Sequence, residues 1–146
     1  MAITNNNAGD YGALVLRAAL GAMWISHALL KWFVFTIAGF AGFLASQGMP
    51  TFLAWPVFLA ELIGGIAILL GVHGRYVSLA LIPIMVGATA THVPNGWLFT
   101  STGGGWEYPV FLIAASVAHF LIGDGAYAVV GRDAGLRSVT AAARYQ

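Results

Sequence analysis

Residues 11–31, YGALVLRAALGAMWISHALLK, decide the fold class of this chain. A membrane-spanning helix needs about 20 mostly apolar residues, and the segment from Tyr11 to Leu30 has that length and character. Three later segments also qualify: Phe52 to Gly71, Tyr76 to Asn95 and Tyr108 to Val130. The sequence therefore predicts an all-α integral membrane protein built as a four-helix bundle.

The composition indicates the same class. Of the 146 residues, 60% are hydrophobic and 8% are charged, whereas a soluble domain has about 25% charged residues. The length suits one domain, so we expect a membrane domain over residues 1–131 and a cytoplasmic C-terminal tail over residues 132–146. The lipid bilayer is the implied partner. A net charge of +1 without clustered arginines excludes a nucleic-acid partner.

Cysteine is absent, which excludes disulfides, thiolate metal sites, cysteine-ligated iron–sulfur clusters and a CxxC redox motif. Redox chemistry would therefore need an added cofactor or a dissolved one such as quinone, and we predict no covalent cofactor. His27 and His92 fall at a similar predicted depth. No spacing motif supports a haem or metal site there, and we predict neither.

The connection from Lys31 to Pro50, KWFVFTIAGFAGFLASQGMP, is apolar but interrupted by three glycines. Phe33, Ile37, Phe40 and Leu44 recur in it at helical spacing. This pattern predicts a short helix between the first two spans, lying in the interface or re-entrant against the bundle, rather than a fifth span.

Basic residues near the helix ends set the predicted orientation. Lys31 alone falls on one side of the bundle. The side of the termini carries five arginines: Arg17, Arg75, Arg132, Arg137 and Arg144. By the positive-inside rule, both termini are expected in the cytoplasm, and the chain is expected as a multi-pass protein of the cell (inner) membrane. The opposite side carries an aromatic belt: Trp32, Trp55, Trp97 and Trp106.

Eight ionisable residues sit in or at the edge of the apolar segments: Arg17, His27, Lys31, Glu61, His92, Glu107, His119 and Asp124. A charge at the bilayer centre costs about 2.5 to 3.5 kcal/mol on insertion scales. Such residues are therefore expected to face the bundle interior, to pair with one another, or to line a path for protons, ions or substrate.

The helical rise of about 1.5 Å per residue divides these side chains into two depth layers. The outer layer holds His27, Lys31, His92 and Glu107. The inner layer holds Arg17, Glu61, His119 and Asp124. An extended Arg17 side chain is expected to reach Glu61 and to form a buried ion pair. Because His119 and Asp124 lie about 120° and 100° around the last helix from Glu107, at least one is expected to face elsewhere.

The first helix carries its polar residues on one face, because Arg17, His27 and Lys31 fall with Trp24 within an arc of about 80°. Small residues accompany these polar faces: Gly21, Gly64 and Gly65. Small residues let helix backbones approach closely in a bilayer, so these faces are predicted to form the packed interior.

Several of these residues also have a structural interpretation. Lys31 could extend to the interface, His92 could be satisfied by a neighbouring carbonyl, and Glu107 could be a helix N-terminal carboxylate. A pair of Arg17 with Glu61 could serve only to lock the bundle. The functional interpretation is a polar intramembrane site near the outer leaflet.

Five sequence blocks occur in order: LRAALGAMWISHALLKWF, GFAGFLASQGMP, AELIGGIAILLGV, THVPNGWLF and GGGWEYPVFLIAA. Together they resemble the DoxX family of small four-helix bacterial and archaeal membrane proteins, from about Leu14 to Tyr127. GWEYP and HVPNGW are the most specific matches. The resemblance places the family's polar positions on these residues: Arg17, His27, Lys31, Glu61, His92 and Glu107, with Trp106, Tyr108 and Pro109 completing the last block.

The resemblance implies a redox association, because the family takes its name from a membrane subunit linked to a thiosulfate:quinone oxidoreductase. We therefore expect a quinone-interacting subunit of a membrane redox system. The expected catalytic residues are His27, Lys31, His92 and Glu107. The expected cofactor-binding residues are Arg17, Trp24, Glu61, Trp106 and Tyr108. Electrons would come from a redox partner protein or a soluble donor, and any enzyme activity would be part of a quinone-linked oxidoreductase.

The sequence leaves two other functions open. The chain could be a structural or assembly subunit that anchors an enzyme complex, alone or as a homo- or hetero-oligomer, with its charges locking the bundle. It could also be a small transporter for protons or a solute. Four helices are few for alternating access, and no inverted repeat is visible.

Overall fold

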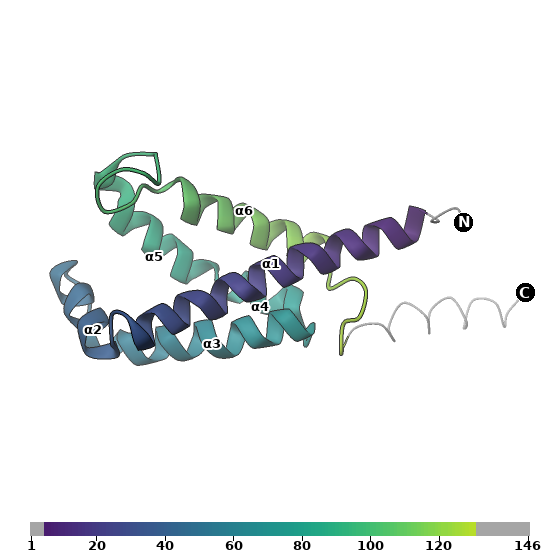
Figure 1. Cartoon of the computed structure of the whole chain (residues 1–146), viewed down its shortest axis with the longest axis horizontal. Helices are drawn as coiled ribbons and strands as arrows, with labels where there is room; N and C mark the ends of the chain where they lie inside the picture. The colour runs from purple at the N-terminus through teal and green to yellow at the C-terminus, as the bar shows by residue number, and fades with distance from the viewer. Residues whose placement is uncertain (1–4, 131–146) are drawn as a thin grey trace, which may run out of the picture.

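The computed structural model describes residues 5–130 as an all-helical bundle (Figure 1). Its elements are α1 (Asn5–Phe33), α2 (Ile37–Ser46), η1 (Thr51–Leu53), α3 (Ala54–Leu70), α4 (Gly74–Ala80), α5 (Ile82–His92), η2 (Val93–Asn95) and α6 (Glu107–Ile122). Three helical stretches are long and apolar enough to cross a membrane: Ala8–Phe33, Thr51–Leu70 and Gly74–Asn95. The prediction of an all-α membrane bundle is confirmed. The predicted C-terminal tail lies outside the described residues.

The two ends of the bundle are formed by different segments of the chain (Figure 1). The end with the start of α1 and with residues 123–130 is called the terminal end below. The end with α2 and the connection of residues 93–106 is called the loop end. Helices α1 and α3 pack side by side along the length of the bundle, and α6 packs against α4 and α5.

The fourth span is shorter than predicted, because α6 ends at Ile122 and not near Val130. Its 16 residues extend about 24 Å, against a hydrocarbon thickness of about 30 Å. Gly123 and Gly125 have φ of 94° and 67°, a left-handed conformation that ends the helix. The chain then turns along the terminal end, where the Ala126 amide donates to the Asp10 carbonyl (3.0 Å).

The third predicted span, Tyr76 to Asn95, is divided into α4 and α5 at Leu81. Pro83 explains the break, because its nitrogen carries no hydrogen and its ring would clash with the carbonyl four residues earlier. A tight turn precedes α4. There Gly71 and His73 both have a positive φ, of 70° and 51°.

The short helix expected between the first two spans is α2, at the loop end. Thr36 begins it with φ of 60° and accepts a hydrogen bond from the Gly39 amide through its side chain (3.1 Å). Gly48 follows it with φ of 72°. At ten residues, α2 extends about 15 Å, too short to span a bilayer. It packs on η1 and α3 and buries Leu44.

Glycines bring α1 and α3 into close contact, as the small-residue pattern predicts. A Cβ atom at Gly21 would lie 2.8 Å from the Leu69 backbone nitrogen. A Cβ atom at Gly65 would lie 2.9 Å from the Ile25 backbone nitrogen. These distances are too short for any real Cβ contact, so the two helices can approach this closely only with glycine on each side.

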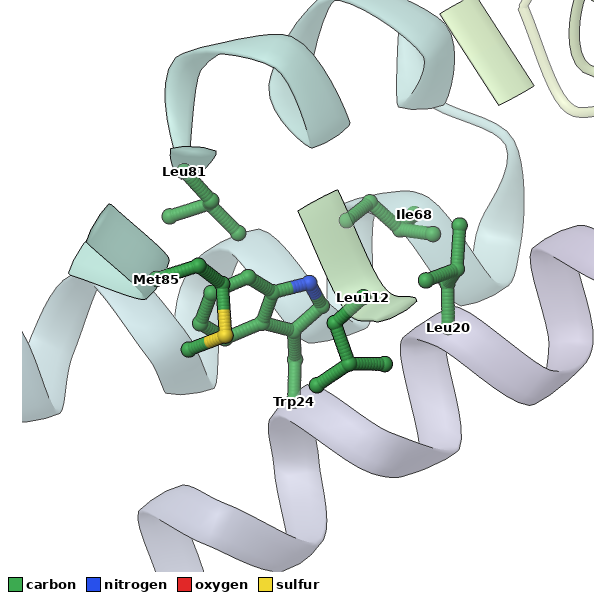
Figure 2. Close-up of a cluster of buried hydrophobic side chains, with 6 residues drawn as sticks. All are labelled: Leu20, Trp24, Ile68, Leu81, Met85 and Leu112. Carbon is green, nitrogen blue, oxygen red and sulfur yellow. The ribbon is translucent and has the colours of Figure 1, made fainter. Parts of the chain in front are cut away.

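An apolar core occupies the middle of the bundle (Figure 2). We call it the hydrophobic layer, and its members are Leu20, Trp24, Ile68, Leu81, Met85 and Leu112. Trp24 is only 2% exposed within it and packs among apolar side chains from other helices (Figure 2). On α1 this layer separates Arg17 from His27. The polar residues of the bundle are therefore divided between its two ends.

Replacing Gly21 with valine is expected to force α1 away from α3 and to lower the free energy of unfolding by about 1–3 kcal/mol or more. The measurement is thermal unfolding of purified protein in detergent. Gly12→Val is the matched control on the same helix, because nothing lies within 4 Å of a Cβ at Gly12. Equal melting temperatures for the two variants would contradict the close-packing assignment.

Candidate functional site at the loop end

A buried ion pair joins α1 to α3. Lys31 Nζ donates to both carboxylate oxygens of Glu61, at 2.9 Å and 2.7 Å. The two side chains are 11% and 2% exposed. The ring of Phe40 in α2 lies over Lys31 Nζ, 5.0 Å from ring centroid to nitrogen, where its π face adds a cation–π attraction.

The predicted pair of Arg17 with Glu61 is wrong. The Arg17 guanidinium lies beside Gly71 and donates to the Asp124 carbonyl (2.8 Å). Gly71 lies about 15 Å along the helix axis from Glu61, so the Arg17 side chain cannot reach it. Lys31 can, because helical side chains point toward the N-terminus and its long aliphatic stem brings the ammonium down from the end of α1.

His27 lies one helical turn before Lys31, on the same side of α1. Its Nδ1 donates to the Met23 carbonyl (3.0 Å). In a neutral ring this bond leaves Nε2 as a hydrogen-bond acceptor. The His27 ring stacks on Tyr108 of α6, with centroids 6.1 Å apart, and the Tyr108 hydroxyl donates to Met23 Sδ. Thus α1 and α6 meet through an imidazole, a phenol and a thioether.

His92 and Glu107 hold the connection between α5 and α6. His92 Nδ1 donates to the Ala88 carbonyl (2.7 Å), and its ring faces Gly104. A Glu107 carboxylate oxygen accepts from the Phe99 amide (2.9 Å). In residues 5–130 no hydrogen bond or ion pair joins His92 or Glu107 to His27 or Lys31. The four residues predicted as one outer cluster are therefore divided among three local environments.

An open groove of about 440 Å³ lies along the loop end of α6. Its lining residues are Trp97, Phe99, Glu107, Tyr108, Val110, Phe111 and Ala114. Apart from Glu107 and the Tyr108 hydroxyl, the lining is apolar. Trp106 contacts Trp97 edge to face, with ring centroids 4.4 Å apart. Tyr108 lines the groove and also stacks on His27, so it connects the groove to the buried polar residues.

A second group of polar residues, the inner polar cluster, lies at the terminal end: Arg17, Arg75, Ser78, His119 and Asp124. Ser78 Oγ and His119 Nδ1 are hydrogen-bonded at 2.7 Å. His119 Nε2 lies 3.1 Å from Asp124 Oδ1, which accepts from the Arg75 amide (2.8 Å). His119 and Asp124 were predicted on one helix, with at least one of them facing away from Glu107. They meet because α6 ends before Asp124 and the chain turns back.

Some contacts of these sites involve residues that the sequence analysis did not select. Met23 and Ser78 carry no charge and match no motif, so nothing distinguishes them from core residues. For Phe40, the helical spacing with Leu44 predicted only that it belongs to an apolar helix face. Across the described residues, no three His, Asp or Glu side chains gather to hold a metal ion.

Comparison with known families identifies the chain. The DoxX family model matches residues 12–94, more than half of the chain. The chain belongs to the DoxX family. The matched region contains His27, Lys31, Glu61 and His92 and ends before Glu107 and the groove. This DoxX protein is therefore a membrane protein in which the buried ion pair lies within the family region.

A curated relative is the putative oxidoreductase CatD of Bacillus subtilis (strain 168). It is 31% identical over 86 residues, which is 59% of this chain and 63% of that protein. The match thus spans less than two thirds of the length of CatD. No solved structure matches this chain.

Replacing Glu61 with glutamine is expected to lower stability by about 3–5 kcal/mol, because it leaves the Lys31 ammonium buried without its carboxylate. Lys31→Met in the same protein should recover most of that loss. Thermal unfolding of the wild type, both single variants and the double variant gives the interaction free energy between the two side chains. Additive losses in the double variant would show that the two side chains do not depend on each other.

Proposed function

We propose that this DoxX protein is a quinone-interacting subunit of a membrane redox system. The observation that carries the proposal is Tyr108, which forms a wall of the apolar groove and stacks on His27 beside the Lys31–Glu61 pair. A quinone has a flat polar ring and an apolar tail. An open apolar groove, with titratable groups behind one wall, matches both parts.

The residues present fit such a ligand. The groove volume of about 440 Å³ lies within the range of about 300–1,000 Å³ typical of small-molecule sites. Trp97, Phe99 and Phe111 supply ring faces for stacking. His27 Nε2 is an acceptor, and the Tyr108 hydroxyl would donate to the ligand in place of its bond to Met23 Sδ, so that together they could hold a ring oxygen in either protonation state.

Each remaining side chain has a distinct part in this proposal. A bound quinone would supply a two-electron couple that also takes up two protons. His27 Nε2 is the atom placed to accept a proton. The Lys31 ammonium is held in place by Glu61 and puts a positive charge near His27. Glu107, at the groove edge, would exchange protons with the aqueous side.

Electrons would come from a partner, because the chain supplies no redox centre of its own. The name of CatD describes that protein as an oxidoreductase, which supports a redox role for the shared region. We propose a redox partner protein that docks on the membrane subunit. His92, Trp106, Arg17 and Trp24 are not among the residues that line the groove, although Trp106 contacts Trp97, and we assign them structural parts in this scheme.

We propose that the protein lies in the inner membrane with both termini in the cytoplasm. Arg17 and Arg75 lie at the terminal end and Lys31 lies at the loop end. The groove would then open to the outer leaflet. The other three arginines used in the sequence argument lie outside the described residues.

An anchoring or assembly subunit is the second candidate, and the closed pairing at the loop end favours it. Lys31 and Glu61 satisfy each other. Glu107 accepts from the Phe99 amide of the connection, and His92 donates to the Ala88 carbonyl of its own helix. A transporter is disfavoured because the hydrophobic layer interrupts the polar residues between the two ends of the bundle.

Saturable binding of a short-tailed quinone to the protein in lipid nanodiscs is expected, seen as quenching of tryptophan fluorescence from Trp97. Tyr108→Ala should weaken binding at least tenfold, equal to about 1.4 kcal/mol, because it removes the groove wall. His27→Ala should weaken it severalfold by removing the acceptor. Ser26→Ala is the matched control, since Ser26 is exposed and bonds only to the Ala22 carbonyl of its own helix.

Absence of saturable quinone binding by the wild-type protein would overturn the proposal. If Glu61→Gln then reduced the amount of a co-purified enzyme, while His27→Ala and Tyr108→Ala left that amount unchanged, the anchoring function would take its place.

A further inference from the structure

The inner polar cluster and the neighbouring Ser116 hold buried polar atoms that protein groups do not satisfy. In the described part of the chain, four buried side-chain atoms lack a hydrogen-bond partner: Arg17 Nε, Arg75 Nε, Ser116 Oγ and His119 Nε2. Three of these residues, Arg17, Ser116 and His119, are at most 2% exposed. His119 Nε2 lies 3.1 Å from Asp124 Oδ1 but outside hydrogen-bonding alignment.

Arg17 of α1 and His119 of α6 meet at Asp124. Arg17 donates to the Asp124 carbonyl, and His119 Nε2 lies beside the Asp124 carboxylate. Ser116 precedes His119 by three positions on α6, so the two side chains share one helix face. A buried donor without a partner is costly. Proteins commonly resolve this with an internal water that makes about three hydrogen bonds to otherwise unsatisfied groups.

The charges of the region favour water over an ion. A metal cation is opposed by the guanidinium groups of Arg17 and Arg75. An anion is opposed by Asp124, which already faces both arginines and His119. Water is neutral, both donates and accepts, and can therefore bond to Arg17 Nε, Ser116 Oγ and either tautomer of His119.

We propose that the inner polar cluster is an internal water-binding site in which an ordered water bridges Arg17 Nε, Ser116 Oγ and His119 Nε2. The site belongs to the terminal half of the bundle. On α1, Leu20 and Trp24 of the hydrophobic layer lie between Arg17 and His27, so this water is separated from the loop-end groove. The proposal holds whether or not a quinone binds there.

Magnetisation transfer from water to the His119 ring tests the site. The full-length protein is prepared in lipid nanodiscs with labelled histidine, and the carbon-bound Hε1 proton of His119 is assigned by comparison with His119→Gln. Transfer to His119 Hε1 is expected, although the side chain is completely buried. His73, which is exposed, serves as the positive control for transfer from solvent.

Ser116→Val is expected to reduce the transfer to His119 at least twofold, because its methyl groups occupy the water position and bring no donor. Ser116→Ala should reduce it less, and it serves in place of the valine variant if that variant fails to fold. Ser26→Ala is the matched control and should leave the transfer unchanged. No transfer to His119 in the wild type, with transfer to His73 intact, would overturn the proposal. Unchanged transfer in both Ser116 variants would overturn it as well.

Discussion

The bilayer does not tolerate a lone charge, and this constraint accounts for the arrangement of the bundle. Lys31 and Glu61 come from different helices, yet neither could lie in hydrocarbon without the other. Their two short contacts join α1 to α3 at the loop end, and Phe40 of α2 covers the ammonium. Gly21 and Gly65 provide the close approach of α1 and α3. Charge pairing and backbone packing therefore depend on the same two helices.

The hydrophobic layer gives the two ends of the molecule separate chemistry. At the loop end a histidine, a tyrosine and an ion pair lie behind an open apolar groove. At the terminal end a serine, a histidine, an aspartate and two arginines form a closed cluster around the turn that follows α6. Six apolar side chains separate the two regions. A reaction at the groove would thus exchange protons with one side of the membrane, which suits a one-sided redox site better than a transmembrane path.

Much of the fold followed from the sequence because hydrophobic length and glycine placement are local properties. The short helix before Pro50 and the start of α6 at Glu107 both depend on residues close together in the chain. The early end of α6 was missed because the apolar composition continues to Val130, while the left-handed glycines that end the helix carry no hydrophobicity signal. The break at Leu81 was missed although Pro83 marks it.

The sequence by itself determined that this is a helical DoxX membrane protein and that Arg17, Lys31, Glu61 and His119 would lie in its interior, since insertion cost and family pattern both act on residue type. Only the tertiary structure decided the partners. Lys31 and not Arg17 reaches Glu61, and Asp124 turns back to His119. Pairing depends on the rotation and axial offset of neighbouring helices, and a shift of one turn exchanges one partner for another. Residue spacing within one helix carries no information about that offset.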